Sequence, residues 1–148
     1  MRKLKLQVQT TIDGFMAGQQ GEMDWMTFNW SDDIKQYVDE LTQPVDTILL
    51  GKNLAAGFIP HWAAVAQDDE NPEKEAGIKF STTHKIVFSK TLTQSEWEHT
   101  EVENGNFIEK IKALKQKPGG DMIVYGGSRF VSSLIKEKLI DELYLFVN

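Results

Sequence analysis

The chain has 148 residues, of which 41% are hydrophobic and 26% charged, as in a single globular domain with a sizeable core. Its formal net charge of −6 disfavours binding to nucleic acid or to an anionic membrane, because both select a basic surface. The absence of cysteine excludes disulfides, thiolate catalysis and cysteine zinc sites. We find no pattern of a signal peptide or of a membrane span, so we expect a cytoplasmic protein.

Six segments have the pattern of β-strands. Leu4, Leu6 and Val8 alternate with polar residues, which is the period of a half-buried strand. Most of the others are short apolar runs that end at glycine or polar residues, which is typical of buried strands in a parallel sheet. The predicted strands are 4–8, 45–51, 84–90, 96–103, 121–125 and 141–147, and the fourth has the weakest alternation.

Helical spacing of apolar residues recurs between these strands. Ser31 is a suitable N-cap for a first helix, which Pro44 ends. We predict further helices from Asn53 to Gly57, over 107–114 and over 128–138, and a long loop with one helical turn over 60–80. Strands that alternate with helices indicate one α/β domain over 1–148, with a largely parallel sheet covered on both faces.

Three strand ends carry residues that suit an anionic ligand. They are Gly51-Lys52-Asn53, Ser89-Lys90-Thr91 and Gly126-Gly127-Ser128-Arg129. Ligands of open α/β sheets bind at the carboxyl ends of strands, where helix N-termini attract anions and lysine or arginine adds charge-assisted hydrogen bonds. Together the three ends are suited to a ligand with several phosphates.

Each strand end also has a simpler interpretation as an ordinary turn or a solvated end. Gly119-Gly120 serves as an internal comparison, because it follows a helix and Pro118 and is explained by a C-cap and turn. Gly126-Gly127 differs because it lies between a strand and a helix. An ordinary turn and a phosphate-binding loop are equally good interpretations of this pair. The dinucleotide fingerprint G-x-G-x-x-G is absent.

The remaining polar and aromatic residues are less informative. Asp32 and Asp33 begin a helix, where the macrodipole alone explains two acids. The three histidines show no metal-ligand spacing, so no metal site is predicted, and no serine, histidine and acid arrangement is visible. Three tryptophans near glycine-rich loops suit either a flat pocket or core packing, namely Trp25, Trp30 and Trp62.

Five segments, in this order, resemble the dihydrofolate reductase-like family. The resemblance is strongest to the reductase domain of bacterial riboflavin biosynthesis and its stand-alone relatives. The segments are "TTIDGFMA" (10–17), "DWMT" (24–27), "DTILLGKNL" (46–54), "KIVFSKTL" (85–92) and "IVYGGSRFVSSLIKEKLIDELYLFV" (123–147). The resemblance implies a three-layer α/β fold with a mixed, mostly parallel sheet between helices.

The resemblance also implies NADPH as cofactor. By motif, Gly51, Lys52 and Asn53 contact phosphates, and Ser89 and Lys90 lie near the 2′-phosphate of the adenosine ribose. The pyrophosphate is received by Gly126, Gly127, Ser128 and Arg129, and the Gly126–Gly127 peptide is expected to be cis. Ala17 lies where the family's first loop meets the nicotinamide side of the pocket.

The activity so implied is hydride transfer from NADPH to a small heterocyclic substrate, pterin- or pyrimidine-like, or to a carbonyl. Asp33, or failing that Asp32, is the candidate proton donor, although the riboflavin-pathway reductases do not share that acid. The alternatives are a non-catalytic nucleotide-binding protein and a purely structural module. Relatives usually continue with one or two further strands, so we expect either that these strands are lacking here or that the sheet closes differently. The resemblance also implies a homodimer, in which a partner would cover the backbone groups of an exposed edge strand.

Overall fold

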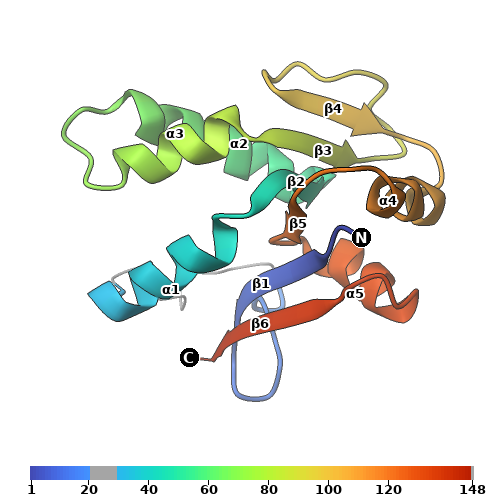
Figure 1. Cartoon of the computed structure of the whole chain (residues 1–148), viewed down its shortest axis with the longest axis horizontal. Helices are drawn as coiled ribbons and strands as arrows, with labels where there is room; N and C mark the ends of the chain where they lie inside the picture. Colours follow the sequence, from blue (N-terminus) through green and yellow to red (C-terminus); the bar gives the residue numbers. More distant parts are fainter. Residues whose placement is uncertain (21–29, 148) are drawn as a thin grey trace.

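The computed structural model describes residues 1–20 and 30–147 (Figure 1). The strands are β1 (Leu4–Thr10), β2 (Val45–Gly51), β3 (His84–Phe88), β4 (Thr100–Glu103), β5 (Asp121–Val124) and β6 (Glu142–Val147). The helices are α1 (Asp32–Thr42), α2 (Lys52–Gln67), α3 (Lys74–Thr82), α4 (Phe107–Gln116) and α5 (Ser128–Lys136). The segment "DWMT" and Trp25 lie outside the described residues.

The six strands form one sheet in the order β4-β3-β2-β5-β1-β6. All five strand pairings in the described part are parallel, so the antiparallel pairing implied by a mixed sheet is not found there. The expected three-layer α/β fold is confirmed. Strand β5 lies between β2 and β1, so the sequence of strands across the sheet changes direction at this position. Open α/β sheets bind ligands in the crevice at such a switch point.

Two apolar layers cover the sheet. On one face, side chains of α4 and α5 such as Ile111 and Leu134 pack on Leu4, Leu6 and Val124. On the other face, α2 and α3 enclose a second cluster of buried residues, Ile48, Leu50, Ala55, Ile59, Val87 and Ile123. Helix α1 lies on this second face over β6, through contacts of Tyr37 with Tyr144 and Phe146.

The prediction of a loop over 60–80 is wrong. Helix α2 continues through Gly57 and Pro60 to Gln67, and α3 follows it after a short turn. The reason is tertiary packing: Ile59 and Val65 are buried, and at Gly77 the two helices approach so closely that a Cβ would lie 2.7 Å from the Ala66 nitrogen. Such packing overrides the low helix propensity of glycine and proline.

The glycines at 119 and 120 are also not the predicted C-cap. Helix α4 ends at Gln116, and its C-cap is Lys117 in an extended conformation. Gly120 instead permits a close approach of two backbone segments, because a Cβ there would lie 2.3 Å from the Pro44 carbonyl oxygen. Its N–H donates to Asp46 Oδ2 at 2.8 Å.

Candidate functional site

The first and third of the predicted strand ends are in direct contact. The Gly51 N–H, at the end of β2, donates to the Gly126 carbonyl oxygen at 3.2 Å. A Cβ on Gly51 would lie 3.3 Å from the Gly127 nitrogen and 3.3 Å from Phe130 Cβ. The absence of a side chain at Gly51 therefore allows the starts of α2 and α5 to lie side by side at the carboxyl edge of the sheet.

The second strand end joins the same cluster through Thr91. Lys52 Nζ donates to Thr91 Oγ1 at 2.7 Å, and Ser89 Oγ lies 3.2 Å from the same hydroxyl. Ser89 Oγ also accepts hydrogen bonds from the backbone N–H groups of Thr91 and Leu92, both at 3.1 Å. An ammonium and two hydroxyls thus form one polar group on the surface, next to the exposed Asn53 in the first turn of α2.

Two helix N-termini at this edge have no side-chain cap. The N-cap residues of α2 and α5 are Gly51 and Gly127, which have no side chain to accept the first-turn N–H groups. In contrast, Asn106 caps α4 by accepting the N–H groups of Ile108 and Glu109. The first-turn N–H groups and the positive dipole ends of α2 and α5 are suited to an anion that bridges them.

The two adjacent glycines have different structural explanations. Gly126 has a φ of +144°, which other residues rarely adopt, and a Cβ there would lie 3.2 Å from Leu54 Cδ2. Gly127 has a φ of −73°, and a Cβ there would have nothing within 4 Å. Backbone conformation and packing therefore account for Gly126 but not for Gly127. The peptide between them is cis, as expected.

The first loop lies beside the glycine pair. Met16 packs against the core under α4 and α5, and its Cε is 3.9 Å from the position of a Cβ on Gly126. Ala17 follows directly and is half-buried. The neighbouring Met16 brings the loop to the glycine pair, and the assignment of Ala17 to the nicotinamide side stays a prediction.

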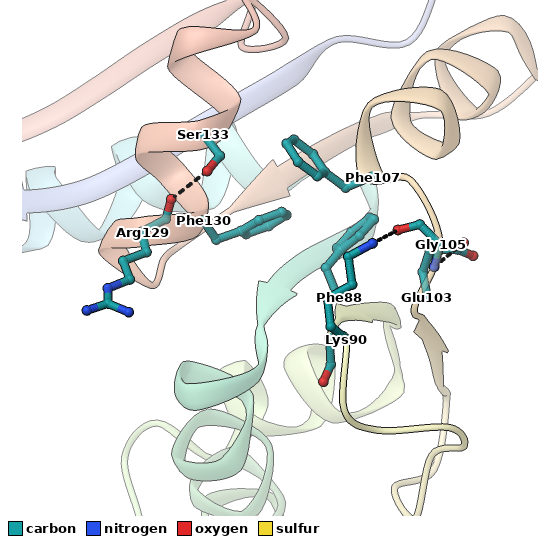
Figure 2. A pocket seen from close by; sticks show the side chains of 9 residues that line it. Phe88, Lys90, Glu103, Gly105, Phe107, Arg129, Phe130 and Ser133 are labelled. Atoms are coloured by element: carbon teal, nitrogen blue, oxygen red, sulfur yellow. Dashed lines mark hydrogen bonds between the residues drawn. The ribbon is translucent and has the colours of Figure 1, made fainter.

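A pocket of about 210 Å³ adjoins the polar cluster, between the end of β3 and the start of α5 (Figure 2). Phe130 stacks on Phe88 with ring centroids 5.0 Å apart, and Phe107 meets Phe130 edge-on at 6.2 Å. The other lining residues are Ser89, Lys90, Glu103, Gly105, Arg129 and Ser133. Figure 2 shows the Arg129 side chain extending away from the rings. The pocket combines aromatic walls with a lysine and an arginine at its rim.

Sequence reasoning missed the aromatic walls of this pocket. Phe88 precedes Ser89 and Phe130 follows Arg129, and both neighbours were predicted site residues. This adjacency was the signal in the sequence that could have indicated the aromatic walls. Phe107 comes from a helix that follows a different strand, and only the fold brings it to the pocket. Lys90 is positioned there by hydrogen bonds from its Nζ to the carbonyl oxygens of Gly105 at 2.9 Å and Asn104 at 3.4 Å.

The two candidate acids belong to α1. Asp32 and Asp33 occupy the first turn of α1 and are exposed, and the Ser31 hydroxyl donates to the Asp33 carboxylate. The hydrogen bonds from Ser31 and from the Ile34 backbone N–H hold the pKa of Asp33 below its ordinary value. Since a proton donor at neutral pH needs a raised pKa, the catalytic role of either acid stays a prediction.

The described tryptophans are packed. Trp62 meets Phe80 at 4.6 Å and Phe58 at 6.3 Å, and Trp30 lies edge-on to Phe146 at 5.6 Å. Among residues 1–20 and 30–147 no three histidines or acids converge as metal ligands. Within the same ranges, every helix is too short or too polar to span a bilayer.

The fold is shared with solved proteins. A putative riboflavin biosynthesis protein from Shewanella sp. PV-4 is 22% identical with a TM-score of 0.66, covering 98% of this chain and 75% of that one. A dihydrofolate reductase from Enterococcus faecalis, solved with NADP(H), is 20% identical with a TM-score of 0.59, covering 97% and 68%. These likenesses define a dihydrofolate reductase-like fold.

The sequence comparisons are more specific. The model of the RibD C-terminal domain family matches residues 2–148, so the chain belongs to the RibD C-terminal domain family. The uncharacterized protein YyaP of Bacillus subtilis (strain 168) is 33% identical over 150 residues, covering 99% of this chain and 74% of YyaP. The uncharacterized protein YwjB of the same organism is 25% identical, covering 99% of this chain and 76% of YwjB.

Proposed function

We propose that this protein is an NADPH-dependent reductase of a small heterocyclic substrate. The observation that carries the proposal is Gly127, whose missing side chain neither backbone conformation nor packing explains. It lies between two helix N-termini that have no side-chain cap. A pyrophosphate bound there would accept hydrogen bonds from the first-turn N–H groups of α2 and α5.

The rest of the cluster fits the other parts of the cofactor. Lys52, Ser89 and Lys90 offer ammonium and hydroxyl donors for the 2′-phosphate of the adenosine ribose. The pocket between Phe88, Phe107 and Phe130 offers flat apolar walls for the adenine. Asn53, Ser128 and Arg129, exposed in the first turns of α2 and α5, add donors toward the phosphates.

Bound NADPH supplies a hydride to an electrophilic carbon of the substrate, which also takes up one proton as NADP⁺ forms. The task of this chain is to hold the two rings together and to exclude water. Met16 lies beside Gly126, and we assign both residues, together with the adjacent Ala17, to the nicotinamide side. Asp33, or Asp32, is proposed as the proton source.

The proposal is tested by titrating the purified protein with NADPH while its tryptophan fluorescence is recorded. We expect quenching and tight binding by the wild type. Gly127→Val should weaken the binding at least tenfold, because its methyl groups occupy the phosphate position, and should leave the melting temperature within about 2 °C. Gly57→Ala is the matched control, because Gly57 also has nothing within 4 Å but lies on the exposed side of α2.

No quenching of the wild type at millimolar NADPH would refute the cofactor assignment. Equal affinities of wild type and Gly127→Val would show that the glycine pair is a turn and not a cradle. A loss of binding in Gly57→Ala as large as in Gly127→Val would also contradict the site.

A non-catalytic nucleotide-binding protein is the second candidate. It is favoured by the exposure of Asp32 and Asp33 and by the lowered pKa of Asp33, since neither suits a proton donor. Cofactor binding without NADPH oxidation across folate, riboflavin-pathway and carbonyl substrates would support it. Oxidation of NADPH with any of these substrates would exclude it.

A further inference from the structure

The Thr91 hydroxyl lies at the centre of the polar group that joins the ends of β2 and β3. Lys52 Nζ donates to Thr91 Oγ1 at 2.7 Å, and Ser89 Oγ lies 3.2 Å from the same atom. Lys52 begins α2, whereas Ser89 and Thr91 follow β3, so these contacts connect two neighbouring strand ends. A lysine side chain that is already held loses less conformational freedom when it binds a ligand.

The number of lone pairs fixes the direction of these hydrogen bonds. A hydroxyl group has one proton to donate and two lone pairs that accept. Both lone pairs of Ser89 Oγ are used, because it accepts the backbone N–H groups of Thr91 and Leu92 at 3.1 Å. Ser89 is therefore free only to donate, and its proton goes to Thr91 Oγ1, which also accepts from Lys52. Thr91 thus keeps its own proton for a partner outside the group.

The three side chains accordingly form a group that only donates. The ammonium of Lys52 has three protons, of which Thr91 accepts one. The other two, together with the proton of Thr91, are accessible to a ligand because both side chains are exposed. A phosphate monoester suits such a group, since it is anionic and has three acceptor oxygens. A ribose hydroxyl suits it poorly, because its own proton finds no acceptor there.

The neighbouring cation is engaged in a different contact. Lys90 Nζ donates to the carbonyl oxygens of Gly105 at 2.9 Å and Asn104 at 3.4 Å, and Figure 2 shows the bond to Gly105. Two of the three protons of Lys90 are thus used by the connection between β4 and α4. Most of the free donors at this edge therefore belong to Lys52 and Thr91.

We propose that Thr91 is a specificity-determining residue, which selects a dinucleotide with a phosphate monoester on its adenosine ribose over one with a free hydroxyl. The inference rests on the proposed function and narrows it. The Thr91 hydroxyl donates to one phosphate oxygen and holds the Lys52 ammonium beside another. A preference for NADPH over NADH follows, because the group offers donors to a phosphate and no acceptor to a hydroxyl.

The test compares NADPH with NADH, which differ only in this phosphate. Both are titrated into the purified chain by calorimetry, without substrate. We expect the wild type to bind NADPH at least tenfold more tightly than NADH. Thr91→Val, which keeps the shape of the side chain, should lose about tenfold in NADPH affinity and less than about twofold in NADH affinity. Thr91→Ser retains the hydroxyl and should keep most of the preference.

Two further variants separate selection from a structural role. Thr93→Val changes an exposed threonine two residues further on and should bind both cofactors like the wild type. In a Lys52→Met background, Thr91→Val should cost less NADPH affinity than in the wild type, because the two residues act through one hydrogen bond. Since Thr91 is exposed, Thr91→Val should keep the melting temperature within about 2 °C of the wild type.

Several results would overturn the role of Thr91. These are equal affinities of the wild type for NADPH and NADH, an unchanged ratio of affinities in Thr91→Val, and full additivity with Lys52→Met. Equal weakening of both cofactors by Thr91→Val would assign this residue a purely structural role. A loss of preference in Thr93→Val as large as in Thr91→Val would also contradict the inference.

The proposed function is scored separately in the same titrations. Failure of both NADPH and NADH to bind the wild type would refute the cofactor assignment itself. Tight NADPH binding by the wild type, together with an unchanged ratio in Thr91→Val, would refute only the role of Thr91.

Discussion

At the scale of single residues, an ionic contact ties the N-terminus to the amino edge of the sheet. The Arg2 guanidinium, 8% exposed, pairs with Asp46 and also donates to Thr47 Oγ1 at 2.9 Å and to the Gly120 carbonyl oxygen at 2.8 Å. Partial burial acts to raise the pKa of Asp46, but the Gly120 N–H, the Thr47 hydroxyl and the Arg2 charge together hold it below its ordinary value.

This lowered pKa predicts a pH dependence. A carboxyl with a lower pKa in the folded state contributes stability above its ordinary pKa of 3.8, and that contribution is lost as the pH falls through the folded value. We expect Asp46→Asn to lower the free energy of unfolding by about 1 kcal/mol at pH 7, because Arg2 keeps only neutral partners, and the difference from wild type to shrink below about pH 4.

Urea unfolding at pH 7 and at pH 3 measures this difference. Asp69→Asn is the control, since the Lys74–Asp69 pair is exposed and such pairs contribute little. A destabilisation by Asp46→Asn that is equally large at both pH values would show that the charge of Asp46 is not the cause.

At the scale of elements, a buried lysine of the next strand, β3, binds the C-terminal end of helix α3. Lys85 Nζ donates to the carbonyl oxygens of Phe80, Ser81 and Thr83 at 2.7, 3.0 and 2.7 Å, and the residue is 1% exposed. Burial lowers the pKa of Lys85 to about 8, while the carbonyl groups at the negative end of the helix favour its ammonium form. Lys85 thus acts as the C-terminal cap of α3.

We expect Lys85→Met to reduce the free energy of unfolding by about 1–3 kcal/mol, because three partly buried carbonyl groups lose their donor. The measurements are thermal unfolding and hydrogen exchange, and in the latter the amides of α3 should lose protection before those of α4. Lys112→Met, on the exposed side of α4, is the control. Unchanged exchange in α3 would contradict the capping role.

At the scale of the whole molecule, one edge of the sheet carries apolar side chains without cover. Strand β6 is the last strand in the sheet order, and Leu143, Leu145 and Val147 on one of its faces are 57%, 49% and 59% exposed. An edge strand with an apolar face is a surface on which a second copy can pack. The expected homodimer therefore remains a prediction, with this strand as its interface.

Sedimentation or light scattering of the purified chain measures the mass. We expect a dimer, and Leu145→Glu should convert it to monomer because a charge in an apolar interface lacks a partner. Ile78→Glu, on α3 and 44% exposed, should leave the dimer intact. A wild-type chain that is monomeric at 0.1 mM, on the order of typical working concentrations, would disprove the homodimer.

The sequence by itself determined the existence of the six strands, of α1, α4 and α5, and of the three strand ends of the candidate site, although β4 begins at Thr100 and not at residue 96. It could do so because the period of apolar residues reports which face of an element is buried, and because parallel strands end at the same edge. The sequence also identified the family, because five segments resemble it in the same order. The expected cis peptide at Gly126–Gly127 was confirmed on that basis.

Only the tertiary structure decided the rest. The length of α2 and the presence of α3 depend on their packing at Gly77, which local propensity does not report. The explanations for glycine at positions 120, 126 and 127 differ, because different atoms lie beside the position of a Cβ at each of them. Likewise, Gln7 and Lys5 look alike in the pattern of β1, and only the fold shows which has a partner. Long-range contacts decide these properties, because they join residues that the chain alone does not place together.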